Sequence, residues 1–289
     1  MIRQDNAGPF LRWAGSKKQL LSKLLSYWDN RHERYIEPFM GSASLFFAIQ
    51  PRKAILSDIN SELVETFIAV RDNPDKVYRS LIEIPRGRDS YYRVRAQATS
   101  ELDSIARAAR FIFLNRFCFN GLYRTNKAGR FNVPFSFSKT GDLPTRLHLE
   151  ACASFLLSAD LRCGDFEKVL LDEVRAGDFV YLDPPYAISN HRIFLQYGPQ
   201  TFGVTDIQRL KRVLNVIEGR GVNFVLSYAS CAEALEAFGT WDIKEVFVRR
   251  NIAGFVKDRR LAKELIFSNC SRLRHRSSRN KKVYHDVTC

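Results

Sequence analysis

The chain has 289 residues, 45% of them hydrophobic, so it is long and apolar enough for a substantial core in one or two domains. Its 45 Lys and Arg against 31 Asp and Glu leave a formal net charge of +14, which favours nucleic acid or an anionic membrane surface as a partner. There is no run of about 18 apolar residues, no signal-peptide core and no C-x-x-C pair among the six cysteines. We therefore expect a cytoplasmic protein with no membrane span, metal site or disulfide framework.

Short apolar runs alternate with amphipathic stretches along much of the chain. Helices are expected over residues 16–28, where four leucines share one face, and over residues 205–217. Strands are expected at residues 34–39, 54–58, 160–163, 178–183, 222–228, 243–249 and 263–268. This alternation predicts an α/β fold with a mainly parallel, doubly wound sheet.

The alternation stops between residues 61 and 159. That segment reads as helices rich in Arg, Tyr and Phe around one hairpin, with its turn near residues 127–129. We expect it to be a domain inserted into a catalytic domain at 1–60 and 160–270. The basic end at 271–289 has no apolar face, and it reads either as a disordered solvated tail or as a nucleic-acid-binding arm.

Three strand ends carry residues suited to a nucleoside ligand. A turn of small residues begins at Gly41 and leads into a helix, which lets a ligand approach the backbone. Asp58 follows at the end of the second strand, where an acid can accept hydrogen bonds from ribose hydroxyls. Asp165, in "CGDFE", is placed either in the same pocket or as the N-cap of the next helix.

The fourth strand ends in "YLDPPY". Two prolines remove hydrogen-bond donors and fix φ, so the chain leaves the sheet stiffly, with Asp183 and Tyr186 held at its exit. Near the N-terminus, "FLRWAGSK" places Trp13 and Lys17 around a turn. Trp13 suits either the core or a pocket, and Lys17 can pair with a carboxylate of the pocket or of a ligand.

Five motifs, "FLRWAGSK", "EPFMGSASLF", "SDIN", "LNRFCFNGLYRTNKAGRFNVPF" and "YLDPPY", occur in an order that resembles the Dam-type (class alpha) DNA adenine-N6 methyltransferases. The resemblance covers about residues 10–250. It implies a Rossmann-like methyltransferase sheet with an inserted target-recognition domain, and S-adenosylmethionine as cofactor. The cofactor contacts that it implies are Trp13, Lys17, Gly41, Asp58, Asp165 and Asp183. One departure is Ala43, where the family usually has a second glycine, and this puts cofactor affinity in question.

By the same resemblance, Asp183, Pro184, Pro185 and Tyr186 form the catalytic segment. The exocyclic nitrogen of adenine is a poor nucleophile because its lone pair is delocalised into the ring. Asp183 and the Pro184 carbonyl would accept its N–H groups and return electron density to nitrogen, which needs no metal. The base must leave the duplex to reach this pocket, and Tyr186 can stack on it.

The resemblance also implies a DNA-reading surface. Phe119 corresponds to an aromatic wedge, or else it packs in the core with neighbouring phenylalanines, and Asn120 would contact the orphaned partner base. Lys127 and Arg130 read as phosphate contacts or as solvated hairpin charges. The positions that match base-reading residues of GATC-specific members are Leu122, Arg124 and Pro134, and Arg12 is also expected to contact DNA.

Three other functions are compatible with parts of the sequence. Cytosine-N4 methyltransferases share the fold, but more often have Ser at the position of Asp183. Glutamine-N5 protein methyltransferases usually have Asn there and lack a DNA-reading hairpin. A DNA-binding module with an inactive cofactor site is the third. We expect a monomer acting on double-stranded DNA, and the sequence leaves open whether it serves a restriction system or a phage, or works alone.

Overall fold

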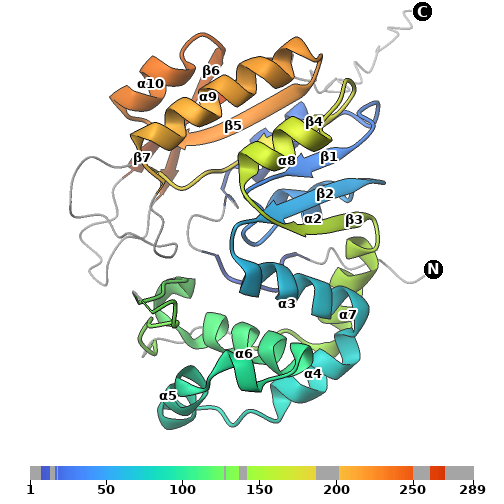
Figure 1. The fold of residues 1–289 in the computed structure, drawn as a ribbon, viewed down its shortest axis with the longest axis vertical. Helices are drawn as coiled ribbons and strands as arrows, with labels where there is room; N and C mark the ends of the chain where they lie inside the picture. The colour runs from blue at the N-terminus through green and yellow to red at the C-terminus, as the bar shows by residue number, and fades with distance from the viewer. Residues whose placement is uncertain are drawn as a thin grey trace, which may run out of the picture.

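A computed structural model describes residues 8–13, 17, 19–126, 128–136, 142–186, 202–249 and 261–270 (Figure 1). Within these ranges, seven strands form one sheet in the order β3-β2-β1-β4-β5-β7-β6. Their bounds are β1 Tyr35–Glu37, β2 Ala54–Asp58, β3 Ala159–Cys163, β4 Phe179–Leu182, β5 Asn223–Ala229, β6 Asp242–Arg249 and β7 Leu261–Ser268. All seven expected strands are present, with ends displaced by a few residues.

The first five strands in this order are parallel, and β7 is antiparallel to both β5 and β6. The chain runs outward from β1 to β2 and β3, then returns to β4 on the other side of β1. The order therefore reverses between β1 and β4. In open α/β sheets a ligand binds at such a switch point, outside the carboxyl ends of the strands.

Helices cover both faces of the sheet (Figure 1). One face packs on α8 (Phe166–Glu173), α9 (Val204–Gly219) and α10 (Ala232–Phe238). The expected helix at 205–217 is confirmed as α9, whose buried face is formed by Ile207, Leu210, Val213, Leu214 and Ile217. The spacing of these residues matches the 3.6-residue period, which is why the sequence predicted the helix correctly.

The expected helix at 16–28 is wrong in length. The structure has only α1 (Leu21–Leu24), followed by a 3-10 turn, η1 (Leu25–Tyr27). Lys17 lies before the helix, where its side chain reaches Asp183 at 2.8 Å. This contact and the burial of Leu20 and Tyr27 fix the chain in a path that the leucine spacing did not reveal.

The segment between β2 and β3 is mostly helical, as predicted. It contains α3 (Ser61–Asp72), α4 (Pro74–Ile82), α5 (Arg88–Ala96), η2 (Thr99–Glu101), α6 (Ser104–Phe117), η3 (Phe119–Gly121) and α7 (Arg146–Leu156). Helices α4, α5 and α6 lie away from the sheet at one end of the molecule (Figure 1).

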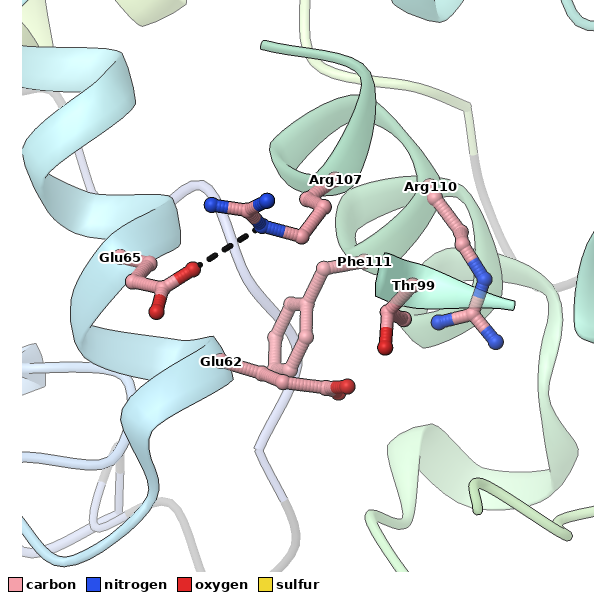
Figure 2. Close-up of a pocket in the computed structure, with 6 residues that line it drawn as sticks. All are labelled: Glu62, Glu65, Thr99, Arg107, Arg110 and Phe111. Atoms are coloured by element: carbon pink, nitrogen blue, oxygen red, sulfur yellow. Dashed lines mark hydrogen bonds and ion pairs between the residues drawn. The ribbon is translucent and has the colours of Figure 1, made fainter. Parts of the chain in front are cut away.

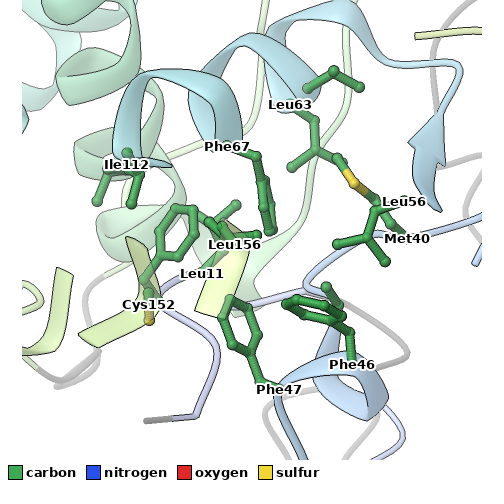
Figure 3. Packing of buried hydrophobic residues seen from close by; sticks show 14 of the residues in the cluster. Leu11, Met40, Phe46, Phe47, Leu56, Leu63, Phe67, Ile112, Cys152 and Leu156 are labelled. Atoms are coloured by element: carbon green, nitrogen blue, oxygen red, sulfur yellow. The ribbon is translucent and has the colours of Figure 1, made fainter. Parts of the chain in front are cut away.

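The sheet and this helical segment share one hydrophobic core (Figure 3). Phe47 comes from α2 (Ser44–Ile49), Phe67 from α3 and Ile112 from α6, and all three are buried in the same cluster. The two parts of the chain therefore support each other by apolar burial. The domain limits at residues 60 and 159 stay a prediction.

The expected hairpin follows α6. It is held by two isolated antiparallel bridges, Cys118 with Phe135 and Thr125 with Phe131, so it is not a continuous ladder. At its turn, the Asn126 Oδ1 accepts backbone N–H groups of Ala128 and Arg130, at 3.0 Å each. Lys127 lies outside the described residues.

No helix in the described ranges is both long and apolar enough to cross a membrane. Over the same part of the chain, no group of three or more His, Cys, Asp and Glu side chains is placed to hold a metal ion.

Candidate active site

The catalytic segment predicted after β4 meets a buried lysine. The Lys17 Nζ lies 2.8 Å from the Asp183 Oδ1, and its side chain is 7% exposed. The same ammonium lies 5.0 Å from the centre of the Tyr186 ring. Burial opposes the charged form of Lys17, but Asp183 and the other acidic groups around it outweigh burial, so the pKa of Lys17 is raised well above its usual value. The short contact with the Asp183 carboxylate therefore favours the ammonium form of Lys17.

Asp183 receives a second donor from the neighbouring strand. The Ser227 Oγ, on β5, lies 3.1 Å from the Asp183 Oδ1, and the Tyr181 hydroxyl lies 3.0 Å from that Oγ. Burial raises the pKa of Asp183, and Lys17 opposes the rise. The Tyr186 ring packs against Tyr228, with ring centres 5.0 Å apart. The Asp-Pro-Pro-Tyr segment is thus fixed by contacts as well as by its prolines.

The turn after β1 is joined to the end of β2. The Gly41 N–H donates to the Asp58 Oδ2 at 3.1 Å, and the Asn60 N–H donates to the Asp58 Oδ1 at 3.0 Å. A Cβ on Gly41 would lie 2.7 Å from the Trp13 ring, and Gly41 has a φ of +46°, so no other residue fits here. Gly41 therefore lies against both Trp13 and Asp58, two residues that separate motifs predicted for the same pocket.

Two features of this turn depart from simple expectation. Burial raises the pKa of Asp58 to about 6, although the backbone N–H groups of Asn60 and Gly41 oppose the rise. Ala43 has a φ of 51°, in the left-handed region. A glycine, which the family usually has at this position, adopts that region freely. Ala43 therefore differs from glycine both in the space that its methyl group takes and in the cost of its left-handed backbone conformation.

Asp165 has the N-cap role that the sequence left open. Its Oδ1 accepts the Glu167 N–H at 2.9 Å at the start of α8. It also accepts from the Arg209 guanidinium at 2.8 Å, and Arg209 lies over the Phe166 ring. The Phe166 ring is 5.2 Å from that of Phe39, which follows β1, so an aromatic pair, buried at Phe166 and partly buried at Phe39, lies beside Asp165 at the carboxyl end of the sheet.

Sequence reasoning missed three polar groups of the site. Glu264, on β7, lies 4.0 Å from the Lys17 ammonium, and Ser227 contacts Asp183 as described. Glu37, on β1, accepts from the Tyr35 hydroxyl at 2.9 Å, and burial raises the pKa of its carboxyl well above the usual value. The available signal was a charged or polar residue inside an otherwise apolar strand, as in "AKELIF" and "FVLSYA".

The segment that carries Arg12 and Trp13 is clamped to the helical part. The Arg12 N–H donates to the Asn115 Oδ1 at 2.8 Å, and the Asn115 Nδ2 donates to the Arg12 carbonyl at 2.6 Å. A Cβ on Gly121 would lie 2.9 Å from that of Arg12. The Trp13 ring stacks on Tyr123, with centres 6.0 Å apart, so one short segment contacts both the Gly41 turn and the hairpin.

The predicted DNA-reading residues lie around the hairpin. Phe119 is 41% exposed, whereas Phe111 and Phe113 are at most 5% exposed, so Phe119 does not pack in the core with them. Asn120 is exposed next to it. The Arg124 Nε donates to the Asn132 Oδ1 at 2.7 Å across the hairpin. Leu122 is half-buried, and Arg130 and Pro134 are exposed.

A separate small pocket lies between α3 and α6 (Figure 2). It is lined by Glu62, Glu65, Thr99, Arg107, Arg110 and Phe111. Its charges have partners within the protein, since Arg107 pairs with Glu65 at 3.1 Å and Arg110 donates to the Val94 carbonyl at 3.0 Å. It contains no strand end, and it is not the site at the β1/β4 switch point.

The fold and this site define a Rossmann-like methyltransferase. The model of the D12 class N6 adenine-specific DNA methyltransferases matches residues 13–252, and the chain belongs to this family. It is therefore an adenine-specific DNA methyltransferase, a class of enzyme that in general uses S-adenosylmethionine.

Individual relatives match over most of their length. The chain is 31% identical over 273 residues to the type II methyltransferase M1.LlaDCHI of Lactococcus lactis subsp. cremoris, covering 91% of this chain and 96% of the relative. It is 33% identical over 268 residues to the type II methyltransferase M.MjaIII of Methanocaldococcus jannaschii, covering 84% and 92%. A DNA adenine methylase of Haemophilus influenzae is 31% identical over 265 residues, covering 89% and 92%.

Proposed function

We propose that this enzyme transfers a methyl group from S-adenosylmethionine to N6 of an adenine flipped out of double-stranded DNA, at GATC sites. The observation that carries the proposal is the meeting of two half-sites at the switch point. The Gly41 turn, bound to Asp58, follows β1, and the segment from Asp183 to Tyr186 follows β4, which pairs directly with β1. A cofactor and a base held by these two segments would lie side by side.

The residues at the first half-site fit the cofactor. Gly41 has no side chain, and the Trp13 ring packs directly against the turn at the position that a side chain would fill. Asp58 offers carboxylate oxygens to ribose hydroxyls, and Asp165 follows β3 at the same edge of the sheet, where Arg209 holds its carboxylate. Lys17 and Asp183 complete the set on the β4 side. When bound, the cofactor supplies an electrophilic methyl group on a sulfonium.

The residues at the second half-site handle the amino group. Asp183 and the Pro184 carbonyl accept hydrogen bonds from its N–H groups, which raises electron density on the nitrogen as it attacks the methyl group. The acceptors need no reorganisation during the reaction, because Lys17 and the prolines already hold this segment. Tyr186, packed on Tyr228, presents a ring on which the flipped base can stack.

The hairpin carries the residues that would flip the target adenine and recognise the neighbouring bases. Extruding a base costs a few kcal/mol of stacking and pairing, and the exposed ring of Phe119 can fill the gap in the stack while Asn120 meets the partner base. Base edges are read by Arg124, by a bidentate contact to guanine, together with Leu122, Pro134 and Arg12. Lys127 and Arg130 contact phosphates, which positions the hairpin without reading sequence.

Adenine is favoured over the alternatives that the sequence left open. The family match describes adenine-N6 chemistry, and Asp183 stands where cytosine-N4 enzymes more often have Ser. An inactive module would have no need of the Lys17–Asp183 pair, since a buried ion pair is costly to maintain.

Expression in a host that lacks DNA methylation, followed by sequencing of methylated adenines, tests the proposal. We expect N6-methyladenine at GATC. The Asp183→Ala variant should lose on the order of 10² or more in methyl-transfer rate while keeping its circular dichroism spectrum. Methylation at another motif would contradict the GATC assignment, and a variant as fast as wild type would contradict the role of Asp183. Calorimetry with S-adenosylmethionine tests cofactor binding independently of turnover.

A further inference from the structure

A chain of hydroxyl groups runs from the interior of the sheet to Asp183. Tyr181, on β4, and Ser227, on β5, are 2% and 0% exposed. The Tyr181 hydroxyl lies 3.0 Å from the Ser227 Oγ, which lies 3.1 Å from the Asp183 Oδ1. The register pairs Leu182 with Leu226, so the next residue of each strand brings Asp183 beside Ser227.

The donors in this chain follow from proton counting. An ionised carboxylate can only accept, so Ser227 donates its single proton to Asp183. Ser227 must then accept from Tyr181, which makes Tyr181 a donor. The Leu182 carbonyl, at 3.5 Å from the Ser227 Oγ, is a weaker competitor for the serine proton. The tyrosine therefore directs the serine proton toward the carboxylate.

Both donors to Asp183 use the same oxygen. The Lys17 ammonium and the Ser227 hydroxyl both contact Oδ1, at 2.8 and 3.1 Å. The Asp183 side chain is 21% exposed, against 7% for Lys17 and 0% for Ser227. The carboxylate is therefore partly accessible, whereas both of its donors are buried. With Oδ1 occupied, the oxygen left for a ligand is Oδ2.

Resting on the proposed function, we propose that Ser227 and Tyr181 are positioning residues that turn the Asp183 carboxylate so that Oδ2 accepts the N–H of the target amino group. The terminal torsion of an aspartate is soft, and the long Lys17 side chain can follow Oδ1 as that torsion turns, so the Lys17 contact alone would leave the plane of the carboxylate free to rotate. The second contact, from Ser227, fixes that plane. Productive acceptor geometry tolerates an error of only about 0.5 Å, so this fixation matters for rate.

Ser227→Ala tests the proposal. We expect kcat to fall by about 10-fold, less than for loss of Asp183 itself, because the carboxylate remains but is less well aimed. The dissociation constants for S-adenosylmethionine and for cognate duplex should change by less than about twofold, since Ser227 is fully buried and offers no surface to either ligand. Tyr181→Phe should lower kcat by a smaller factor, because it acts through Ser227.

The matched control is Ser268→Ala. Ser268 is also a buried serine of the same sheet, on β7, but its hydroxyl donates to the Cys270 carbonyl at 3.4 Å. The register places Ser268 opposite Val225, two residues before Ser227 on β5, but the Ser268 hydroxyl bonds to Cys270 and not to Tyr181, Ser227 or Asp183. The kcat of the Ser268→Ala variant should equal that of wild type. A general effect of losing a buried hydroxyl would appear in both variants.

The decisive readout is a double-mutant cycle. In the Ser227→Ala background, Tyr181→Phe should cause no further loss of kcat, since Tyr181 acts on Asp183 only through the Ser227 hydroxyl, which this background lacks. Three results would overturn the proposal. They are a kcat of Ser227→Ala equal to that of wild type, a loss of kcat in Ser268→Ala equal to that in Ser227→Ala, and a loss from Tyr181→Phe that adds fully to that from Ser227→Ala. If Ser227→Ala does not fold, as judged by circular dichroism, a wild-type kcat in Tyr181→Phe overturns it alone. No cofactor binding and no methylation by wild type would instead overturn the proposed function.

Discussion

At the scale of single residues, Asp58 gives the site a pH dependence. Its pKa is about 6 in the folded protein and about 3.9 in an unfolded chain. The folded state therefore binds this proton more tightly, and Asp58 makes folding less favourable as pH rises from about 4 to about 6. A shift of about two units corresponds to about 2–3 kcal/mol at pH 7.

Urea unfolding of wild type and Asp58→Asn between pH 4 and 7 measures this effect. Since asparagine does not titrate, wild type should lose about 2 kcal/mol of unfolding free energy relative to the variant over this range. Parallel pH profiles for the two proteins would show that Asp58 keeps an ordinary pKa.

The sequence predicted the residues of the site unevenly. Lys17, Gly41, Asp58 and Asp183 lie in motifs with unusual local chemistry, and the structure pairs Lys17 with Asp183 and Gly41 with Asp58. Glu264 belongs to the site through the antiparallel pairing of β7 with β5, far along the chain. Such a contact depends on strand order and register, which local patterns do not contain.

At the scale of elements, strands were easier to predict than the first helix. The strands are short apolar runs bounded by turn residues, and all seven were found. The leucines at 20–25 have a helical spacing, yet only one turn of α-helix forms there. The contact of Lys17 with Asp183 and the burial of Tyr27 oppose a longer helix, and helix propensity is a weak prior against such tertiary effects.

The hairpin gives a prediction about specificity. Arg124 is held across the hairpin by Asn132, which aims its guanidinium, and we expect it to read guanine. Arg124→Ala should cost about 1–3 kcal/mol of discrimination, so methylation at sites with that guanine replaced should rise relative to the cognate site by about one to two orders of magnitude.

Methylation rates on duplexes substituted at each position next to the target adenine measure this change. Arg130→Ala is the matched control, because Arg130 is exposed at the turn of the same hairpin and should weaken all duplexes alike. An equal loss on every duplex for Arg124→Ala would make it a phosphate contact or a structural residue.

At the scale of the whole molecule, the hydrophobic core and the net charge have different roles. One apolar cluster joins the sheet to the helical segment, which fixes the hairpin relative to the catalytic strands. The net charge of +14 has no such role, since surface charge says little about the fold. It is suited to DNA, where neutralised phosphates release counterions and binding depends on salt.

The basic end at 271–289 should contribute to this salt dependence, although it lies outside the described residues. Six Lys and Arg occur between residues 271 and 282, and each phosphate contact adds about −0.9 to the slope of log affinity against log salt concentration. Deleting residues 271–289 should make the slope for non-cognate duplex shallower and weaken binding at low salt. Affinity for S-adenosylmethionine, measured on the same proteins, should not change, because the proposed cofactor residues all precede the deletion. Binding isotherms at several salt concentrations provide the slopes. An unchanged slope and affinity would mean that the end is a solvated tail and that the DNA contacts lie elsewhere on the molecule.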